Sequence, residues 1–172
     1  SAGLTRITGF DLSSTGSDFA PDMLIKVSSC TYSTGSPNAS FRIDHNTFAG
    51  DDIGHIFVGC HGRGLVDHNT FTWAGNNEVV HVWGTSSGDG TGWVDDVAPG
   101  TDAAVYFEDN TFSNTISGGY LGGKVLSVYG ARVVYRYNTF DCAVIDVHGN
   151  TPRSGRFWEL YGNHFQLTTC DN

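Results

Sequence analysis

The feature that most constrains this chain is a short motif that recurs along most of its length. Asn-Thr-Phe occurs four times and Asn-His-Phe once, at intervals of roughly 20 to 40 residues. The asparagines of these motifs are Asn46, Asn69, Asn110, Asn138 and Asn163. Self-similarity at this spacing indicates a repeat protein, in which each repeat buries its apolar face against its neighbours.

Each motif follows a segment of alternating residues, such as Phe41-Arg-Ile-Asp-His, and this alternation is typical of a β-strand. Three residues before each asparagine stands a side chain that we expect to point inward, in the row Ile43, Val66, Phe107, Tyr135 and Leu160. A second type of strand recurs between the motifs, and its expected inward row is Ile25, Ile56, Val80, Leu126 and Ile145.

We therefore predict an all-β fold, a right-handed single-stranded parallel β-helix. About five coils, each with two strands, would stack ~4.8 Å apart. Residues 1–172 would form a single domain, with an insertion loop at about 84–102 as a candidate functional lip. The motif asparagines are expected at the corners, where their amides would form a ladder.

The four cysteines show no Cys-x-x-Cys spacing, which argues against a zinc module. Cys30 and Cys60 follow the same strand in neighbouring repeats, and Cys142 and Cys170 follow successive motif corners. We expect the disulfides 30–60 and 142–170. Disulfides favour an extracellular, secreted protein.

The charge balance limits the partners of this chain. It has 18 acidic and 9 basic side chains, a formal net charge of −9. Such a field repels nucleic acid and anionic membrane surfaces, and we expect neither as a partner. No apolar run approaches the ~20 residues of a membrane span. Neutral glycans or divalent cations are better matches.

One outward row of the motif strands stacks three carboxylates, Asp44, Asp67 and Glu108, with Arg136 in the next coil. At ~4.8 Å these carboxylates repel, so that either one pKa rises or a cation binds, and Ca²⁺ is the natural candidate. The spacing would also suit the carboxylate pair of a glycosidase. A solvated face with Arg136 as counter-ion is the simplest alternative.

The second type of strand presents an expected aromatic step, formed by Trp83 and Tyr129. His81, Asp146 and His148 stand beside it, and flat rings with polar neighbours suit a sugar face. We therefore expect a glycan to bind here, with Arg136 as a further contact. The alternative is that these rings pack beneath a covering loop.

Two histidines, His45 and His68, each precede a motif asparagine and should stack on each other. Together with Asp44 and Asp67 they could bind a transition metal. Corner histidines that hydrogen-bond to backbone are the alternative.

The segments Ile43-Asp-His-Asn-Thr-Phe and Val66-Asp-His-Asn-Thr-Phe resemble a strand of the pectate lyases, which are right-handed parallel β-helices. The run from Pro152 through Arg156 to Asn163-His-Phe is similar to that family's arginine motif and closing strand. The resemblance implies a Ca²⁺-assisted lyase that holds calcium at the acidic row, with Arg156 in the arginine motif. Asn150 stands where the family has its base arginine, so that Arg153 or Lys124 would have to serve as the base.

Two hypotheses of function follow. The first is an extracellular protein that binds or processes polysaccharide, as a lyase or glycoside hydrolase if it is an enzyme. The second is a non-catalytic structural or adhesive solenoid, a fibre, filament or carbohydrate-binding element. Because we find no capping helix, the second predicts end-to-end self-association. An ice-binding role is a weaker third idea, since the repeated threonines of the motif fall at corners.

Overall fold

The computed structural model describes residues 4–14, 23–27, 40–50, 54–59, 62–75, 78–84, 100–102, 104–115, 123–128, 130–147 and 155–168. At residues 123, 124 and 126 it describes the backbone alone. In these segments the regular structure consists of β-strands, which confirms the all-β prediction. The strands form three sheets, and neighbouring strands pair in parallel throughout the described residues.

Sheet A consists of β1 (Thr5–Thr8), β4 (Ser40–Asp44), β7 (Arg63–Asp67), β10 (Val105–Glu108), β13 (Arg132–Arg136) and β16 (Phe157–Tyr161). Sheet B consists of β2 (Asp11–Ser14), β5 (Thr47–Gly50), β8 (Thr70–Trp73), β11 (Thr111–Asn114), β14 (Thr139–Asp141) and β17 (His164–Gln166). Sheet C consists of β3 (Ile25–Val27), β6 (Ile56–Val58), β9 (Glu78–Trp83), β12 (Gly123–Val128) and β15 (Ala143–Asp146).

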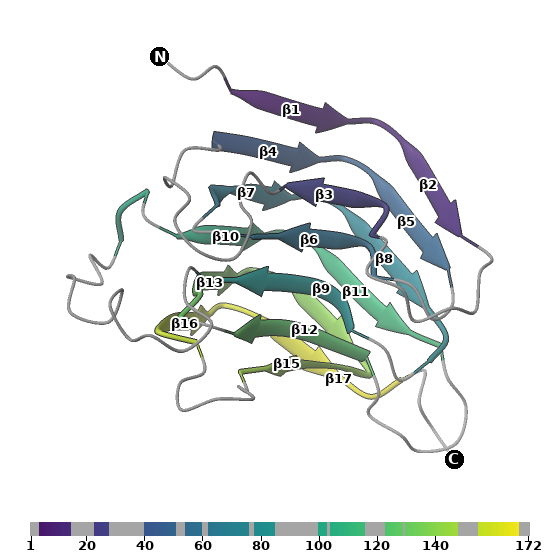
Figure 1. Cartoon of the computed structure of the whole chain (residues 1–172). Helices are drawn as coiled ribbons and strands as arrows, with labels where there is room; N and C mark the ends of the chain where they lie inside the picture. Colours follow the sequence, from purple (N-terminus) through teal and green to yellow (C-terminus); the bar gives the residue numbers. More distant parts are fainter. Residues whose placement is uncertain are drawn as a thin grey trace.

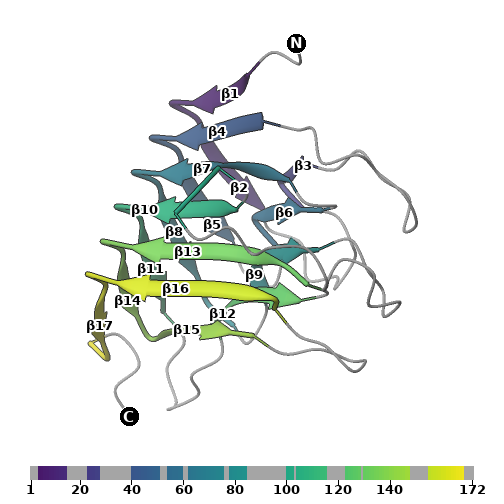
Figure 2. The same cartoon turned by 90° about the vertical axis from the view of Figure 1, so that its left-hand side faces the viewer.

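The chain visits the three sheets in turn, and each visit adds a strand beside the previous one (Figure 1). Figure 2 shows sheet A from its outer side, with β1 at one end of the stack and β16 at the other. This arrangement is consistent with a parallel β-solenoid.

A single residue turns the chain from sheet A into sheet B at each described corner. It has a left-handed backbone conformation, with φ between 53° and 76°. The corner residues are Gly9, His45, His68, Asp109, Tyr137 and Gly162. The Asn-x-Phe motif then begins a strand of its own, so that each complete repeat has three strands instead of the predicted two. Buried and exposed side chains alternate again after the bend, so the motif residues belong to a strand of sheet B and not only to a corner.

The core follows the predicted inward rows. Ile43, Val66, Phe107 and Tyr135 pair in register across sheet A and are fully buried. In sheet B the motif phenylalanines stack with ring centroids 4.6 to 4.9 Å apart, in the order Phe48, Phe71, Phe112, Phe140 and Phe165. Each repeat therefore adds one ring to a continuous aromatic column.

The predicted asparagine ladder is confirmed. The side-chain oxygen of Asn69 accepts hydrogen bonds from the backbone N–H and the side-chain amide of Asn46, at 2.9 and 3.0 Å. The same pair of bonds joins Asn69 to Asn110, Asn110 to Asn138, and Asn138 to Asn163. The ladder satisfies amide groups at a corner where sheet A no longer supplies partners.

Strand β12 departs from the predicted alternation. The sequence predicts Leu126 in the inward row and Ser127 on the outer face. The pairing of β12 with β9 shifts by one residue between Lys124 and Val125, so that Val125 takes the inward position. Ser127 is fully buried, and its hydroxyl is satisfied by a hydrogen bond with the buried hydroxyl of Tyr135 at 3.1 Å.

Candidate functional site

The outward row of sheet A has the predicted register. Asp44, Asp67, Glu108, Arg136 and Tyr161 occupy the same position on five successive strands. Asp44 and Asp67 are nevertheless buried, whereas Glu108 and Arg136 are partly exposed. Because a buried carboxylate is costly without a partner, the neighbours of the two aspartates decide what this row can do.

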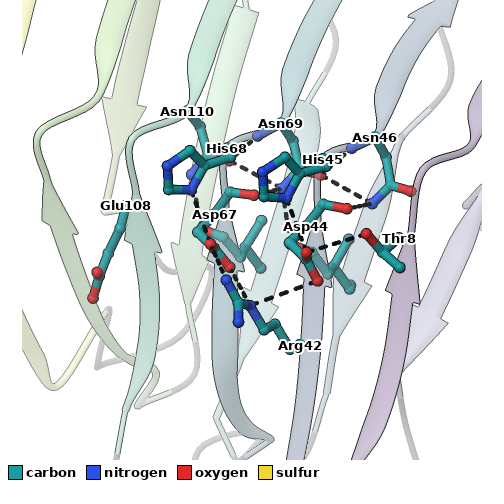
Figure 3. A network of polar contacts seen from close by, with 12 residues as sticks. Thr8, Arg42, Asp44, His45, Asn46, Asp67, His68, Asn69, Glu108 and Asn110 are labelled. Atoms are coloured by element: carbon teal, nitrogen blue, oxygen red, sulfur yellow. Dashed lines mark hydrogen bonds and ion pairs between the residues drawn. The ribbon is translucent and has the colours of Figure 1, made fainter.

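Each buried aspartate is held by an arginine from the preceding strand, and Figure 3 shows this for Arg42 and Asp67. Arg6 donates to the two carboxylate oxygens of Asp44 at 2.8 and 2.6 Å. Arg42 donates to the two oxygens of Asp67 at 2.9 and 2.7 Å, and its Nε lies 3.6 Å from Asp44 Oδ1. The two forks form one continuous ion-pair ladder across β1, β4 and β7.

The ladder keeps both carboxyl groups ionised. The hydrogen bonds from Arg6 hold the pKa of Asp44 well below its usual range, against the opposing effect of burial. For Asp67, burial raises the pKa, but hydrogen bonds from Arg42 and His68 outweigh it and the net pKa is lowered. The two aspartates therefore act as fixed charges and not as proton donors near neutral pH.

The two corner histidines bind the neighbouring aspartates and not the backbone. Nδ1 of His45 lies 2.9 Å from Asp44 Oδ2, and Nδ1 of His68 lies 2.9 Å from Asp67 Oδ2 (Figure 3). The two rings stack with centroids 5.0 Å apart and an interplanar angle of 4°. Their Nε2 lone pairs therefore point in the same direction and do not converge on one metal ion.

The predicted calcium ligands do not converge either. The oxygens of Asp44 and Asp67 face arginine and histidine donors, and Glu108 forms an ion pair with Arg136. Within the described segments no group of three or more His, Cys, Asp and Glu side chains is arranged to hold a metal ion. Ca²⁺ requires six to eight oxygen ligands, so this arrangement does not fit a calcium site.

Replacing Arg42 by Met should destabilise the protein by about 2 kcal/mol at pH 7, because Asp67 would remain buried without its partner. The contribution of the pair is present above the unfolded pKa of an aspartate, about 4, and is lost as the pH falls through the lowered pKa of Asp67. Urea unfolding at pH 7 and pH 3 measures both effects. Arg63→Met is the matched control, because Arg63 has no acidic partner among the described residues. Equal losses in the two variants would contradict the assignment.

The ladder is interrupted between β7 and β10. Leu65 occupies the position that Arg6 and Arg42 occupy on the two preceding strands. Glu108 therefore has no arginine at the equivalent position of its preceding strand, and it pairs with Arg136 from the following strand. Beside this interruption lies a cavity of about 560 Å³, whose lining includes Leu65.

Tyr106, Arg136 and Tyr161 are among the groups that line this cavity. The Arg136 guanidinium lies 5.2 Å from the ring centroid of Tyr106 and 6.0 Å from that of Tyr161. Arg136 also donates to the Tyr161 hydroxyl at 2.8 Å, and this bond is the main reason that the pKa of Arg136 is raised. Burial raises the pKa of Tyr106, with Glu108 and Glu159 as acidic neighbours. The cavity thus combines two tyrosine rings, fixed charges and an apolar floor.

Only part of the predicted glycan surface lies among the described residues. Trp83 and His81 are on β9, and the Trp83 ring packs edge-on against the Phe57 ring, with the ring centroids 5.1 Å apart. His81 Nε2 lies 2.8 Å from Glu78, and Asp146 ends β15. Tyr129 and His148 lie outside the described residues. Arg136 belongs to sheet A, so the structure separates it from Trp83, His81 and Asp146 on sheet C.

The predicted catalytic groups stay predictions. Arg156 precedes β16, and its backbone N–H donates to the Ala131 carbonyl at 2.8 Å. It is not among the residues that line the 560 Å³ cavity. Lys124 is on β12, where only its backbone is described, and Arg153 lies outside the described residues.

Sequence reasoning did not select Leu65, Tyr106, Tyr161 or Glu159, although it placed all four in outward rows. A comparison of equivalent positions in successive coils would have indicated these residues. The second outward row consists of Arg42, Leu65, Tyr106, Val134 and Glu159. The charged side chain of Arg42 is followed by the apolar Leu65 and then by the aromatic ring of Tyr106.

No protein-family model, curated protein or solved structure matches this chain. The resemblance to pectate lyases therefore rests on the motifs quoted above and on the parallel sheets. The described part of the chain contains no helix long and apolar enough to cross a membrane. The cavity of about 560 Å³ on sheet A, called the sheet A cavity below, is the candidate functional site.

Proposed function

We propose that this chain is an extracellular polysaccharide-binding protein whose glycan lies in the sheet A cavity, across Leu65, Tyr106 and Tyr161. The observation that carries the proposal is the pair of tyrosine rings flanking the Arg136 guanidinium inside a cavity of about 560 Å³. That volume falls within the roughly 300 to 1,000 Å³ of typical small-ligand sites.

The chemistry of the lining suits a sugar. A pyranose ring has an apolar face that packs on a tyrosine ring, and a rim of hydroxyl groups that hydrogen-bond to charged side chains. Arg42 and Arg136 supply donors, and Glu108 and Glu159 supply acceptors. Most of these charges are already paired within the protein, which favours a neutral or weakly charged glycan over a polyanion.

Binding is better supported than cleavage. Glu108 and Glu159 both line the cavity, as a glycoside hydrolase would require of its carboxylates. Glu108 is engaged by Arg136, however, and the lyase assignment would need Arg156, Arg153 or Lys124 at the cavity. Processing of the bound glycan is therefore the secondary proposal.

The finer features of the fold belong to the same proposal. We propose a right-handed, pectate-lyase-like β-helix of about five coils, since parallel crossover connections are right-handed in nearly all proteins. Disulfides 30–60 and 142–170 are part of it. Cys142 is buried at the end of β14, and Cys30, Cys60 and Cys170 lie outside the described residues.

The proposal predicts that Tyr106→Ala weakens glycan binding about tenfold, because a stacked aromatic contact contributes about 1.5 kcal/mol. A panel of neutral and acidic polysaccharides in affinity electrophoresis, with Ca²⁺ and with chelator, would measure it. Released reducing or unsaturated ends would reveal cleavage, and loss of signal with chelator would reveal a calcium requirement.

Leu167→Ala is the control, because Leu167 is exposed and does not line the cavity. Retention of wild-type binding by Leu167→Ala together with weak binding by Tyr106→Ala is the expected result. A wild-type protein that binds no polysaccharide of the panel would contradict the proposal and favour the structural or adhesive solenoid.

A further inference from the structure

The two ends of the strand stack carry backbone groups that the described fold does not use. Successive residues of a parallel strand direct their N–H and C=O groups to opposite neighbours. The Tyr161 carbonyl accepts from the Tyr137 N–H, so Trp158 and Leu160 direct their backbone groups away from β13. His164 donates to the Asn138 carbonyl, so Phe165 directs its groups away from β14.

The first strands of the stack carry such unused backbone groups as well. The Phe10 carbonyl accepts from the Thr47 N–H, so Asp11 and Ser13 direct their N–H and C=O groups away from β5. Among the described residues, β1 and β2 are the first strands of sheets A and B, and β16 and β17 are the last. Each end therefore offers a strand edge that can accept another parallel strand.

Exposed apolar side chains gather at these ends. The described residues include seven large hydrophobic side chains that are exposed, and six of them belong to the first or last strands and their flanks. Those six are Leu4, Phe10, Trp158, Tyr161, Phe165 and Leu167. The aromatic column of sheet B ends at Phe165, which packs on Phe140 at 4.9 Å and is 54% exposed. Scattered exposure would need no explanation, but exposure concentrated at two strand edges does, with Tyr137 as the one exception among these seven residues.

The residues at the two ends complement each other in the register of the fold. If β1 continued sheet A beyond β16, Arg6 would face Glu159 and Ile7 would face Leu160. If β2 continued sheet B beyond β17, Asp11 would face His164, and Leu12 would cover the open Phe165 ring. At these four positions polar residues meet polar partners and apolar residues meet apolar ones, whereas Thr5 would face Trp158.

We propose that a second copy of this chain stacks head to tail on the first, with its β1 and β2 adding in parallel to β16 and β17. The contact is heterologous, so a third copy can add in the same way and the product is an open rod. The association is concentration-dependent, because each contact forms between separate molecules.

Ser13→Pro tests the edge pairing. Proline removes an N–H that the described fold does not use and that an incoming strand requires, and proline is tolerated at sheet edges. Sedimentation velocity from micromolar to near-millimolar protein should show association of the wild type and at least tenfold weaker association of Ser13→Pro. Ser13→Ala keeps the N–H and should behave as the wild type.

A charge exchange tests the register. His164→Glu places a carboxylate opposite Asp11 of the next copy and should weaken association about three- to fivefold. Mixing this variant with an equal amount of Asp11→Lys should restore association. In a rod where the two variants alternate, each contact is either the wild-type pair or the introduced lysine opposite the introduced glutamate. Neither position lines the sheet A cavity, so glycan binding should be unchanged.

A wild type that remains monomeric at all these concentrations would overturn the proposal, and the ends would then be covered by something other than a second copy. Association that is insensitive to both Ser13→Pro and His164→Glu would also overturn it, because the contact would lie elsewhere. Either outcome leaves the glycan proposal intact, since Tyr106 and Arg136, which carry that proposal, lie on β10 and β13 and not on the end strands.

Discussion

Replacing Asn69 by alanine should destabilise the folded protein by about 4 kcal/mol, a large loss for one residue. Its side-chain amide donates to the Ile43 and Asp67 carbonyls at 2.9 and 3.0 Å and to the Asn110 side chain. Its oxygen accepts from the Asn46 backbone and side chain. Alanine would leave several buried polar groups without partners, and each costs about 1 to 3 kcal/mol.

The control for Asn69→Ala lies on the last rung of the same ladder. Asn163 is only half-buried, so water can replace part of its bonds, and Asn163→Ala should cost about 1 to 2 kcal/mol. Urea unfolding followed by circular dichroism would measure both variants. Equal small losses would show that the ladder is a consequence of coil stacking and not one of its causes.

The second large effect is a loss of stability in weak acid that a single residue causes. His55 is fully buried, and its ring lies 5.8 and 6.0 Å from the rings of Phe48 and Phe71. Burial lowers its pKa from 6.5 to about 4, against the smaller opposing effect of the Gly50 backbone, and neither ring nitrogen has a hydrogen-bond partner within the described residues. The folded protein therefore holds this imidazole neutral in a range where the unfolded chain protonates it.

The sign of the effect follows from that difference. Between pH 6.5 and pH 4 the unfolded state binds a proton that the folded state does not bind, so acid favours unfolding. The free energy of unfolding falls by about 3 kcal/mol across this range, because the pKa differs by about 2.5 between the two states and each pKa unit corresponds to about 1.36 kcal/mol. The paired carboxylates Asp44 and Asp67 lose their contribution only below about pH 4, so the two effects occupy different pH ranges.

His55→Leu should remove most of the loss between pH 7 and pH 4.5, because leucine has nothing to protonate and fits an apolar site. The measurement is urea unfolding at several pH values for the wild type, His55→Leu and His164→Leu. His164 is exposed, so its replacement should leave the pH dependence of the free energy of unfolding nearly unchanged. If the free energy of unfolding of His55→Leu still fell with pH as in the wild type, the acid sensitivity would belong to other groups.

Much of the fold could be predicted because the repeat supplies its own register. Once Asn69 and Asn110 occupy equivalent corners, Asp67 and Glu108 must lie two residues before them on neighbouring strands, and they do. The inward row and the asparagine ladder follow from the same counting. The third strand was missed because the corner residue His68 bends the backbone without any glycine or proline to mark the turn.

The candidate site could be predicted only in part, because its properties depend on contacts between coils that alternation does not specify. Period two places Asp44 on the outer face, but its burial results from Arg6 and His45 folding over it. The cavity depends on one change in a row of equivalent positions, where Leu65 replaces arginine. The one-residue shift in β12 places Ser127 in the core, where it bonds to the Tyr135 hydroxyl, a contact with another strand that local sequence does not reveal.

The most direct test of the account is a crystal structure with an oligosaccharide chosen from the polysaccharides that the wild type binds. The account predicts a sugar ring packed on Tyr106, with its hydroxyl groups within hydrogen-bonding distance of Arg42, Arg136 or Glu159. An oligosaccharide bound on sheet C beside Trp83 and His81, with the sheet A cavity empty, would contradict it.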